Sequence, residues 1–174
     1  GVAAGIQIQA NNTVITQTGD ISTDGTQNTG VFILGGDNTI NLTGDMTSVG
    51  ALSNSFKLTL GSSSNTINMI GNITKSDDSS SAFLLDQGAS SNTINMTGNI
   101  TTTGDNTSSF KLDDSESNNI TINGNIITAG TDGDSEPILL ENSDSNTFTL
   151  SGAVHSLGGD QAISVDANSQ SNTF

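Results

Sequence analysis

Apolar and polar residues alternate in short stretches along this chain, and these stretches are near copies of one another. Residues 91 to 101 read S-N-T-I-N-M-T-G-N-I-T, with an apolar residue at alternate positions of 93 to 97. Similar stretches occupy residues 37 to 47, 64 to 74, 117 to 127 and 145 to 155. A period of two residues is typical of a strand with one buried face, and it excludes the 3.6-residue period of an amphipathic helix.

The glycine that closes each copy recurs at the spacing of a solenoid repeat. These glycines are Gly19, Gly44, Gly71, Gly98, Gly124 and Gly152. Neighbouring members lie 25 to 28 residues apart (44 − 19 = 25 and 152 − 124 = 28), which is a coil length known from solenoid proteins. A second turn residue follows six positions later, at Gly25, Gly50, Asp77, Gly104, Gly130 and Gly158. We interpret the first glycine column as a structural corner that needs positive φ.

Each coil is expected to contain three short strands and five inward side chains. In one coil these are Ile94 and Met96, then Ile100, then the pair Phe110 and Leu112. The pairs equivalent to the last one are read as Ile6/Ile8, Phe32/Leu34, Phe56/Leu58, Phe83/Leu85, Ile138/Leu140 and Ile163/Val165. Strands one coil apart run parallel and pair about 4.8 Å apart. The sequence therefore predicts an all-β fold, a parallel β-helix (β-solenoid) of about six coils, right-handed by the crossover rule.

An asparagine heads each copy of the repeat. The column consists of Asn38, Asn65, Asn92, Asn118, Asn146 and Asn172. A row of amides could grip the hydroxyl groups of a carbohydrate. We favour a structural role, because asparagine tolerates the left-handed conformation of a corner and stacked amides hydrogen-bond from coil to coil.

Composition and charge narrow the classes of function. Of 174 residues, 31% are hydrophobic, three are Lys or Arg and 18 are Asp or Glu, for a formal charge of −15. This charge repels phosphate backbones and anionic lipid, so we exclude nucleic-acid binding. No apolar run approaches 18 residues, so we expect no membrane insertion of this segment. The absence of cysteine is compatible with either redox environment.

Acidic residues gather in three places outside the predicted strands. They are Asp77 and Asp78; Asp113, Asp114 and Glu116; and Asp132, Asp134 and Glu136. The last two groups are weak candidates for Ca²⁺, which takes several carboxylate oxygens. The groups do not share one phase of the repeat and the calcium-binding nonapeptide of solenoids is absent, so we favour solvated loop charge. No other cofactor is expected.

Few residues are candidates for catalysis. His155 is the only histidine, and the chain has no cysteine and no arginine with which to build a nucleophilic site. Lys57 and Lys111 share an outward phase two coils apart, which suggests a role in solubility or edge protection. We therefore predict that the chain is not an enzyme, with a polysaccharide-active β-helix enzyme as the alternative.

The outward positions of the first strand raise a further alternative. Thr93, Asn95 and Thr97 belong to a flat face of hydroxyl and amide groups, as in an ice-binding solenoid. Ile70 interrupts this face and threonine is mixed with asparagine, whereas threonine is also simply a good residue for a solvated strand. Ice binding is kept as a second alternative.

The repeats resemble those of a known family. The coil S-N-T-I-N-M-T-G-N-I-T, followed by a T-G-D loop and by S-F-K-L-D, looks like the passenger repeats of bacterial autotransporters and related large surface adhesins. The resemblance covers essentially the whole chain. It implies secretion to the bacterial outer surface, an extracellular β-helical stalk, coat or filament, and a role in adhesion.

The two ends of the chain share the phase of the repeat. G-V-A-A-G-I-Q-I-Q-A-N-N at residues 1 to 12 matches G-G-D-Q-A-I-S-V-D-A-N-S at 158 to 169, and Phe174 stands in the phase of Phe148. We expect residues 1–174 to form one solenoid segment that starts and ends in mid-coil and belongs to a longer repeat protein or filament. Expected partners are like chains stacked end to end, and a host, neighbouring-cell or glycan surface.

Overall fold

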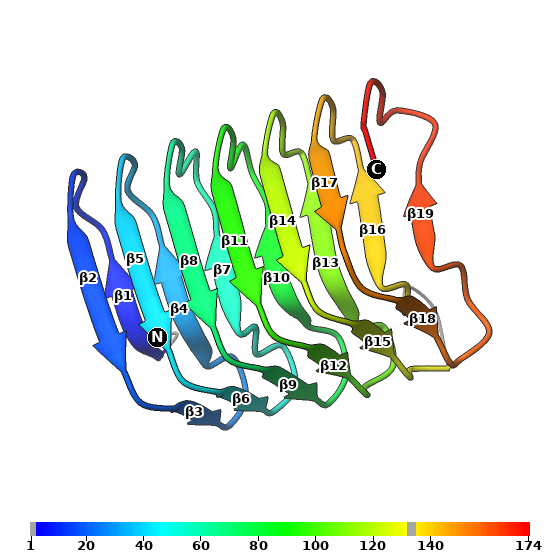
Figure 1. Cartoon of the computed structure of the whole chain (residues 1–174), viewed down its shortest axis with the longest axis horizontal. Helices are drawn as coiled ribbons and strands as arrows, with labels where there is room; N and C mark the ends of the chain where they lie inside the picture. The colour runs from blue at the N-terminus through cyan, green and yellow to red at the C-terminus, as the bar shows by residue number, and fades with distance from the viewer. Residues whose placement is uncertain (1–2, 132–134) are drawn as a thin grey trace.

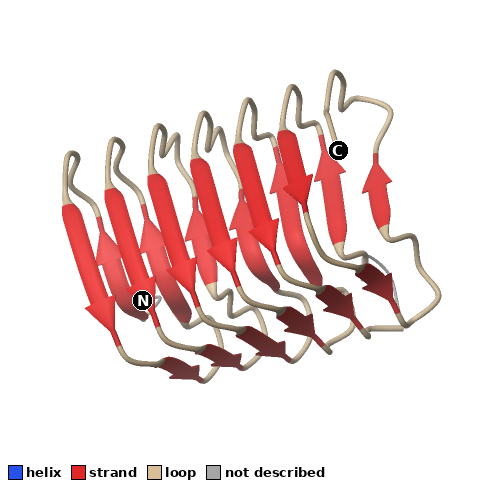
Figure 2. Cartoon of the chain, viewed as in Figure 1, coloured by secondary structure: helices blue, strands red, loops and turns tan. Residues whose placement is uncertain are grey.

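The computed structural model describes residues 3–131 and 135–174 and consists of strands joined by turns and loops (Figure 1). No helix occurs in these two ranges (Figure 2). The strands form three parallel sheets, called here sheets A, B and C. The chain visits one strand of each sheet in turn as it winds around a common core. The predicted β-solenoid, with three strands in each of about six coils, is confirmed.

The strand bounds follow the repeat. Sheet A contains β1 (Ala4–Ile8), β4 (Thr29–Ile33), β7 (Phe56–Leu58), β10 (Ser81–Leu85), β13 (Ser108–Asp113), β16 (Ile138–Glu141) and β19 (Ile163–Val165). Sheet B contains β2 (Val14–Thr18), β5 (Thr39–Thr43), β8 (Thr66–Ile70), β11 (Thr93–Thr97), β14 (Asn119–Asn123) and β17 (Thr147–Leu150). Sheet C contains β3 (Ile21–Asp24), β6 (Met46–Val49), β9 (Ile73–Ser76), β12 (Ile100–Thr102), β15 (Ile126–Thr128) and β18 (Val154–Ser156).

Equivalent residues of successive coils lie in register across each sheet. Ile94 of β11 pairs with Ile67 of β8 on one side and with Ile120 of β14 on the other. Inward residues of all three sheets meet in one continuous apolar core. Because every strand inside a sheet pairs with the coils above and below it, each inner coil depends on its neighbours for most of its backbone hydrogen bonds.

Aromatic rings stack along sheet A. The ring centroids of Phe56 and Phe83 are 4.5 Å apart and those of Phe83 and Phe110 are 4.7 Å apart, with nearly parallel planes. This distance matches the spacing of neighbouring strands, so the rings stack face to face as the sheet repeats. The next ring, Phe148, comes from sheet B and meets Phe110 edge to face at 5.9 Å.

The predicted inward pair Phe32 and Leu34 is wrong. In β4 the buried residues are Val31 and Ile33, in register with Phe56 and Leu58 of β7. The second residue of the inward pair precedes the corner asparagine by five positions in this coil (38 − 33 = 5) and by seven positions in the next coil (65 − 58 = 7). Alignment on the phenylalanines therefore displaces the phase by one residue, and such a displacement moves every side chain to the other face of the strand.

Sheet C contains an inward position that the sequence did not reveal. Ser48, Lys75, Thr102 and Thr128 occupy it in successive coils and are buried. The hydroxyl of Thr102 donates to that of Thr128 at 2.9 Å. The Lys75 ammonium instead donates to the backbone carbonyls of Gly50, Ser76 and Asp77. Its pKa is lowered from the ordinary lysine value because burial disfavours the charge more than Asp77 and Asp78 favour it.

Candidate functional site

The asparagine column forms a buried ladder at the corner between sheets A and B. The backbone N–H and the side-chain Nδ2 of Asn65 both donate to Oδ1 of Asn92, at 2.9 and 3.0 Å. Asn65 Nδ2 also donates to the carbonyl of Gly35 at 3.1 Å. Equivalent rungs join Asn38 to Asn65, Asn92 to Asn118 and Asn118 to Asn146, and the backbone N–H of Asn146 donates to Asn172. These amides are used within the corner, so they present no row for a carbohydrate.

The left-handed residue at this corner is the one that precedes the asparagine. Ser64 and Ser91 have φ of +58° and +56°. The expectation that the asparagine itself adopts this conformation is therefore wrong. The asparagine instead begins the path into sheet B, where its backbone N–H is directed along the stack toward the next coil.

The glycine column lies at the corner between sheets B and C, where successive coils approach closely. Gly71 has φ of +143°, and a Cβ atom at this position would lie 2.0 Å from the carbonyl oxygen of Gly44. Gly98 repeats this geometry against Gly71. Both the backbone angle and the neighbouring coil thus exclude a side chain. Of the remaining members, Gly19, Gly44 and Gly124 also have positive φ, and a Cβ atom at Gly152 would lie 2.0 Å from the carbonyl oxygen of Gly124.

A second ladder follows directly after the glycines, and sequence reasoning missed it. The side-chain oxygens of Asp20, Asp45, Asn72, Asn99 and Asn125 each accept the backbone N–H of the equivalent residue in the next coil. The signal is the Asp or Asn that follows the glycine in five copies of the repeat. Short polar side chains can satisfy a neighbouring backbone N–H at such a corner.

The asparagines in the central column of the flat face of sheet B hydrogen-bond to one another. Nδ2 of Asn95 donates to Oδ1 of Asn68 at 2.9 Å, and Nδ2 of Asn68 donates to Oδ1 of Asn41 at 2.9 Å. The side chain of Ile70 is 60% exposed and interrupts the outer threonine column. His155 lies exposed in β18 on the outer face of sheet C, opposite Ile127.

The calcium candidates that the structure describes form no metal-binding group. Asp113 lies in β13, whereas Asp114 and Glu116 are exposed in the turn that follows it. Asp132 and Asp134 lie outside the described residues, which include their neighbour Glu136. Within residues 3–131 and 135–174, no group of three or more His, Asp or Glu side chains could hold a metal ion.

A groove of about 430 Å³ crosses the outer face of sheet A over β7, β10 and β13. Its floor is the column Lys57, Leu84 and Lys111, whose members are in register across the three strands. Asp86 and Asp113 lie beside this column, two residues further along the chain than Leu84 and Lys111. The groove thus combines charged groups of both signs with an apolar centre.

One wall of the groove is made by the loops that lead into these strands. Leu52, Ser79 and Asn106 line it and have φ of +58°, +57° and +50°. The backbone N–H of Leu52 donates to the carbonyl of Asp78, and that of Ser79 donates to Asp105, so these left-handed residues stack coil on coil. A leucine with positive φ is uncommon. Leu52 is 49% exposed at the rim of the groove.

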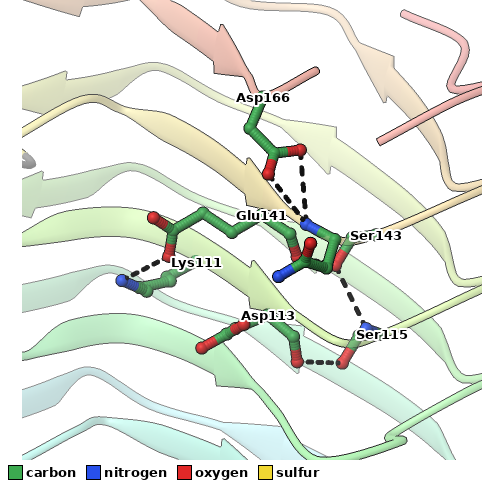
Figure 3. A network of polar contacts seen from close by, with 7 residues as sticks. Lys111, Asp113, Ser115, Glu141, Ser143 and Asp166 are labelled. Atoms are coloured by element: carbon green, nitrogen blue, oxygen red, sulfur yellow. Dashed lines mark hydrogen bonds and ion pairs between the residues drawn. The ribbon is translucent and has the colours of Figure 1, made fainter. Parts of the chain in front are cut away.

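Ion pairs join successive coils along the groove. Nζ of Lys57 lies 3.1 Å from Oδ2 of Asp86, and Nζ of Lys111 lies 2.8 Å from Oε2 of Glu141 (Figure 3). The two lysines, which were expected to serve solubility or edge protection, thus link neighbouring coils on the outside of sheet A. Ion pairs that are partly exposed contribute little to the free energy of folding. These two pairs are therefore as well suited to fixing the side chains along the groove as to holding neighbouring coils together.

Two carboxylates of the groove have unusual surroundings. Burial raises the pKa of Asp113, and the charges of Glu141, Asp114 and Asp86 raise it further against the opposing effect of Lys111. Oδ1 of Asp86 is buried and has no hydrogen-bond partner among the described residues. By contrast, the pKa of Asp166, one coil beyond Glu141, is lowered by hydrogen bonds from Ser169 and from the backbone N–H of Asn142. Figure 3 shows the Asp166 carboxylate close to the strand that carries Glu141.

Comparison with models of known protein families, with curated proteins and with solved structures finds no match to this chain. Residues 3–131 and 135–174 contain no helix of the length and hydrophobicity needed to cross a membrane.

Proposed function

We propose that this chain is a non-enzymatic segment of an extracellular bacterial surface protein, a β-solenoid that serves as a stalk, coat or filament and carries adhesive contacts. The observation that carries the proposal is the pairing of successive coils through all three sheets. A column of such coils transmits force along its axis through many parallel backbone hydrogen bonds, which suits a stiff extension from a cell.

The chemistry of the surface supports the same role. The charge of −15 keeps an elongated particle soluble and separates it from anionic cell envelopes. Most asparagine and aspartate side chains of the corners are engaged in ladders that hold one coil to the next. The resemblance of the repeats to those of autotransporter passengers and large adhesins supplies the proposed compartment, the bacterial outer surface.

Surface labelling of cells that produce the protein naturally tests this proposal. Antibodies raised against the purified chain are expected to label intact cells as strongly as permeabilised ones. Protease added to intact cells is expected to remove the label, while a cytoplasmic protein of the same cells stays undigested. Labelling that requires permeabilisation would contradict the surface location and with it the adhesive role.

A further inference from the structure

The ion pairs of the groove on sheet A follow one rule of register. Lys57 is in register with Leu84 and pairs with Asp86, two residues beyond that leucine. Lys111 is in register with Leu139 and pairs with Glu141, again two residues beyond. A lysine of the central column therefore reaches the acid of the next coil at a fixed offset.

Leu84 interrupts this rule between the two lysines. A cation at position 84 would pair with Asp113, because residue 84 is in register with Lys111 and Asp113 lies two residues beyond Lys111. Leucine supplies no charge, and Asp113 makes no ion pair with any residue that the structure describes. Its raised pKa has the causes expected of a carboxylate that is partly desolvated among other acids. The groove thus contains one carboxylate that makes no ion pair with any described residue.

The space above Leu84 has the shape and polarity to receive that cation from outside. The groove of about 430 Å³ is open to solvent, with Leu84 at its centre and the exposed side chain of Leu52 at its rim. Asp86 lines the same groove, and its Oδ2 pairs with Lys57. An alkyl stem that ends in a positive charge is complementary to this groove, because the groove has apolar surface on its floor and carboxylate oxygens beside that floor.

We propose that this groove binds a lysine or arginine side chain presented by a partner protein, with its stem on Leu84 and its cationic group at Asp113. The bound side chain completes the row of alternating ion pairs between Lys57–Asp86 and Lys111–Glu141. The charge of −15 on the chain attracts a basic partner and repels an acidic one.

A metal ion does not fit the same position. Lys57 and Lys111 lie within one coil of it on either side, and hard cations require several oxygen ligands. No group of acids in the described ranges meets that requirement. An organic cation carries one charge at the end of an apolar stem, so it matches both Asp113, which makes no ion pair with a described residue, and Leu84.

This inference gives the adhesive solenoid proposed above a specific contact, and it rests on the proposed function for its biological setting. Binding is measured on the isolated chain, whereas the proposed function is tested by labelling cells. Failure of the groove to bind would leave the surface location intact, and failure of surface labelling would leave the binding data intact.

A titration with a blocked five-residue peptide that carries one central lysine tests the proposal. With ¹⁵N-labelled protein, the amide resonances of residues 84, 86 and 113 are expected to shift in a saturable manner. The same peptide with norleucine in place of lysine is the matched control and is expected to cause no saturable shift. Equal binding of both peptides would overturn the assignment of a cationic ligand.

Variants of the groove locate the site. Asp113→Asn is expected to weaken binding of the lysine peptide about tenfold or more, as befits the loss of a charged partner. Asp114→Asn, which changes an exposed acid outside the groove by the same chemistry, is expected to leave the affinity unchanged. Equal weakening by both variants would show that only overall charge matters and would overturn the proposal.

A second pair of variants keeps the test independent of how Asp113→Asn folds. Leu84→Lys supplies the missing cation within the chain and is expected to abolish peptide binding. Leu84→Met keeps an uncharged stem and is expected to retain it. Undiminished binding by Leu84→Lys would overturn the proposal. Free 1,5-diaminopentane binding as tightly as the peptide would overturn the assignment to a protein side chain.

Discussion

Substitution of one buried asparagine of the ladder measures how much the ladder contributes to the free energy of unfolding, separately from the contribution of strand propensity. Asn92 is completely buried, and its Oδ1 accepts two hydrogen bonds from Asn65 at 2.9 and 3.0 Å. Its Nδ2 donates to the carbonyl of Ser62 and to Oδ1 of Asn118, both at 3.1 Å. Asn92→Ala therefore removes four hydrogen bonds. It leaves the buried backbone N–H of Asn65 without an acceptor among the described residues, whereas the other three partner groups each keep one hydrogen bond.

The expected cost follows from those partners. A buried polar group left unsatisfied costs about 1 to 3 kcal/mol, and neighbouring losses are not additive. We expect Asn92→Ala to lower the free energy of unfolding by about 3 to 5 kcal/mol, which is large for one substitution. Asn95→Ala is the matched control, because Asn95 lies in β11 on the exposed face and donates one hydrogen bond, to Asn68. Its expected cost is about 0.5 kcal/mol.

Urea unfolding followed by circular dichroism measures both costs. The midpoint is expected to fall strongly for Asn92→Ala and slightly for Asn95→Ala, with the same slope m for both variants and the parent chain. A shift of the midpoint for Asn92→Ala no larger than that for Asn95→Ala would refute the structural role of the ladder.

Two further substitutions test the corners and the core. Gly98→Ala is expected to lower the free energy of unfolding by about 3 kcal/mol or more, because the added Cβ would lie 2.0 Å from the Gly71 carbonyl oxygen. In Gly19→Ala, the control, the added Cβ meets no atom within 4 Å, so we expect a cost of about 1 kcal/mol for the positive φ alone. Thermal melts that show equal destabilisation by both variants would contradict the close approach of the coils. Lys75 has a lowered pKa in the folded chain, so between that value and about 10.4 the unfolded chain binds more protons and stability rises with pH. Lys75→Thr, which restores the hydroxyl of neighbouring coils, is expected to flatten this rise below about pH 10.4 in urea unfolding. An unchanged dependence of stability on pH would show that Lys75 is not desolvated.

The sequence predicted most of the coil because its side chains obey two simple constraints. The alternation in Thr93-Ile94-Asn95-Met96-Thr97 and the recurring glycine defined the strands of sheet B and the corner after them. The buried faces of these strands are uniform from coil to coil, so one copy is as informative as another. The loops between these strands differ in length, and the sequence alone does not show how a difference in loop length changes the register of the strand beside it.

The errors arose where such a loop sets the register. In β4 a shorter link to the asparagine corner places Val31 and Ile33 inward, although Phe32 resembles the phenylalanines of later coils. Lys75 was not recognised as inward because a charged residue is rarely buried, and its ammonium is satisfied by backbone carbonyls that only the folded corner assembles. The groove escaped notice for a similar reason, since the offset from Lys57 to Asp86 becomes visible only once the register of sheet A is known.

Distances between spin labels along one outward column test the stacked coils most directly. Ser22, Thr47 and His155 are exposed on the outer face of sheet C, with five coil steps from Ser22 to His155 and four from Thr47 to His155. The chain has no cysteine, so introduced cysteines take the labels alone. At about 4.8 Å per coil, the account predicts backbone separations of about 24 Å for the first pair and about 19 Å for the second. Broad distributions, or two separations that do not differ by about one coil step, would contradict the solenoid.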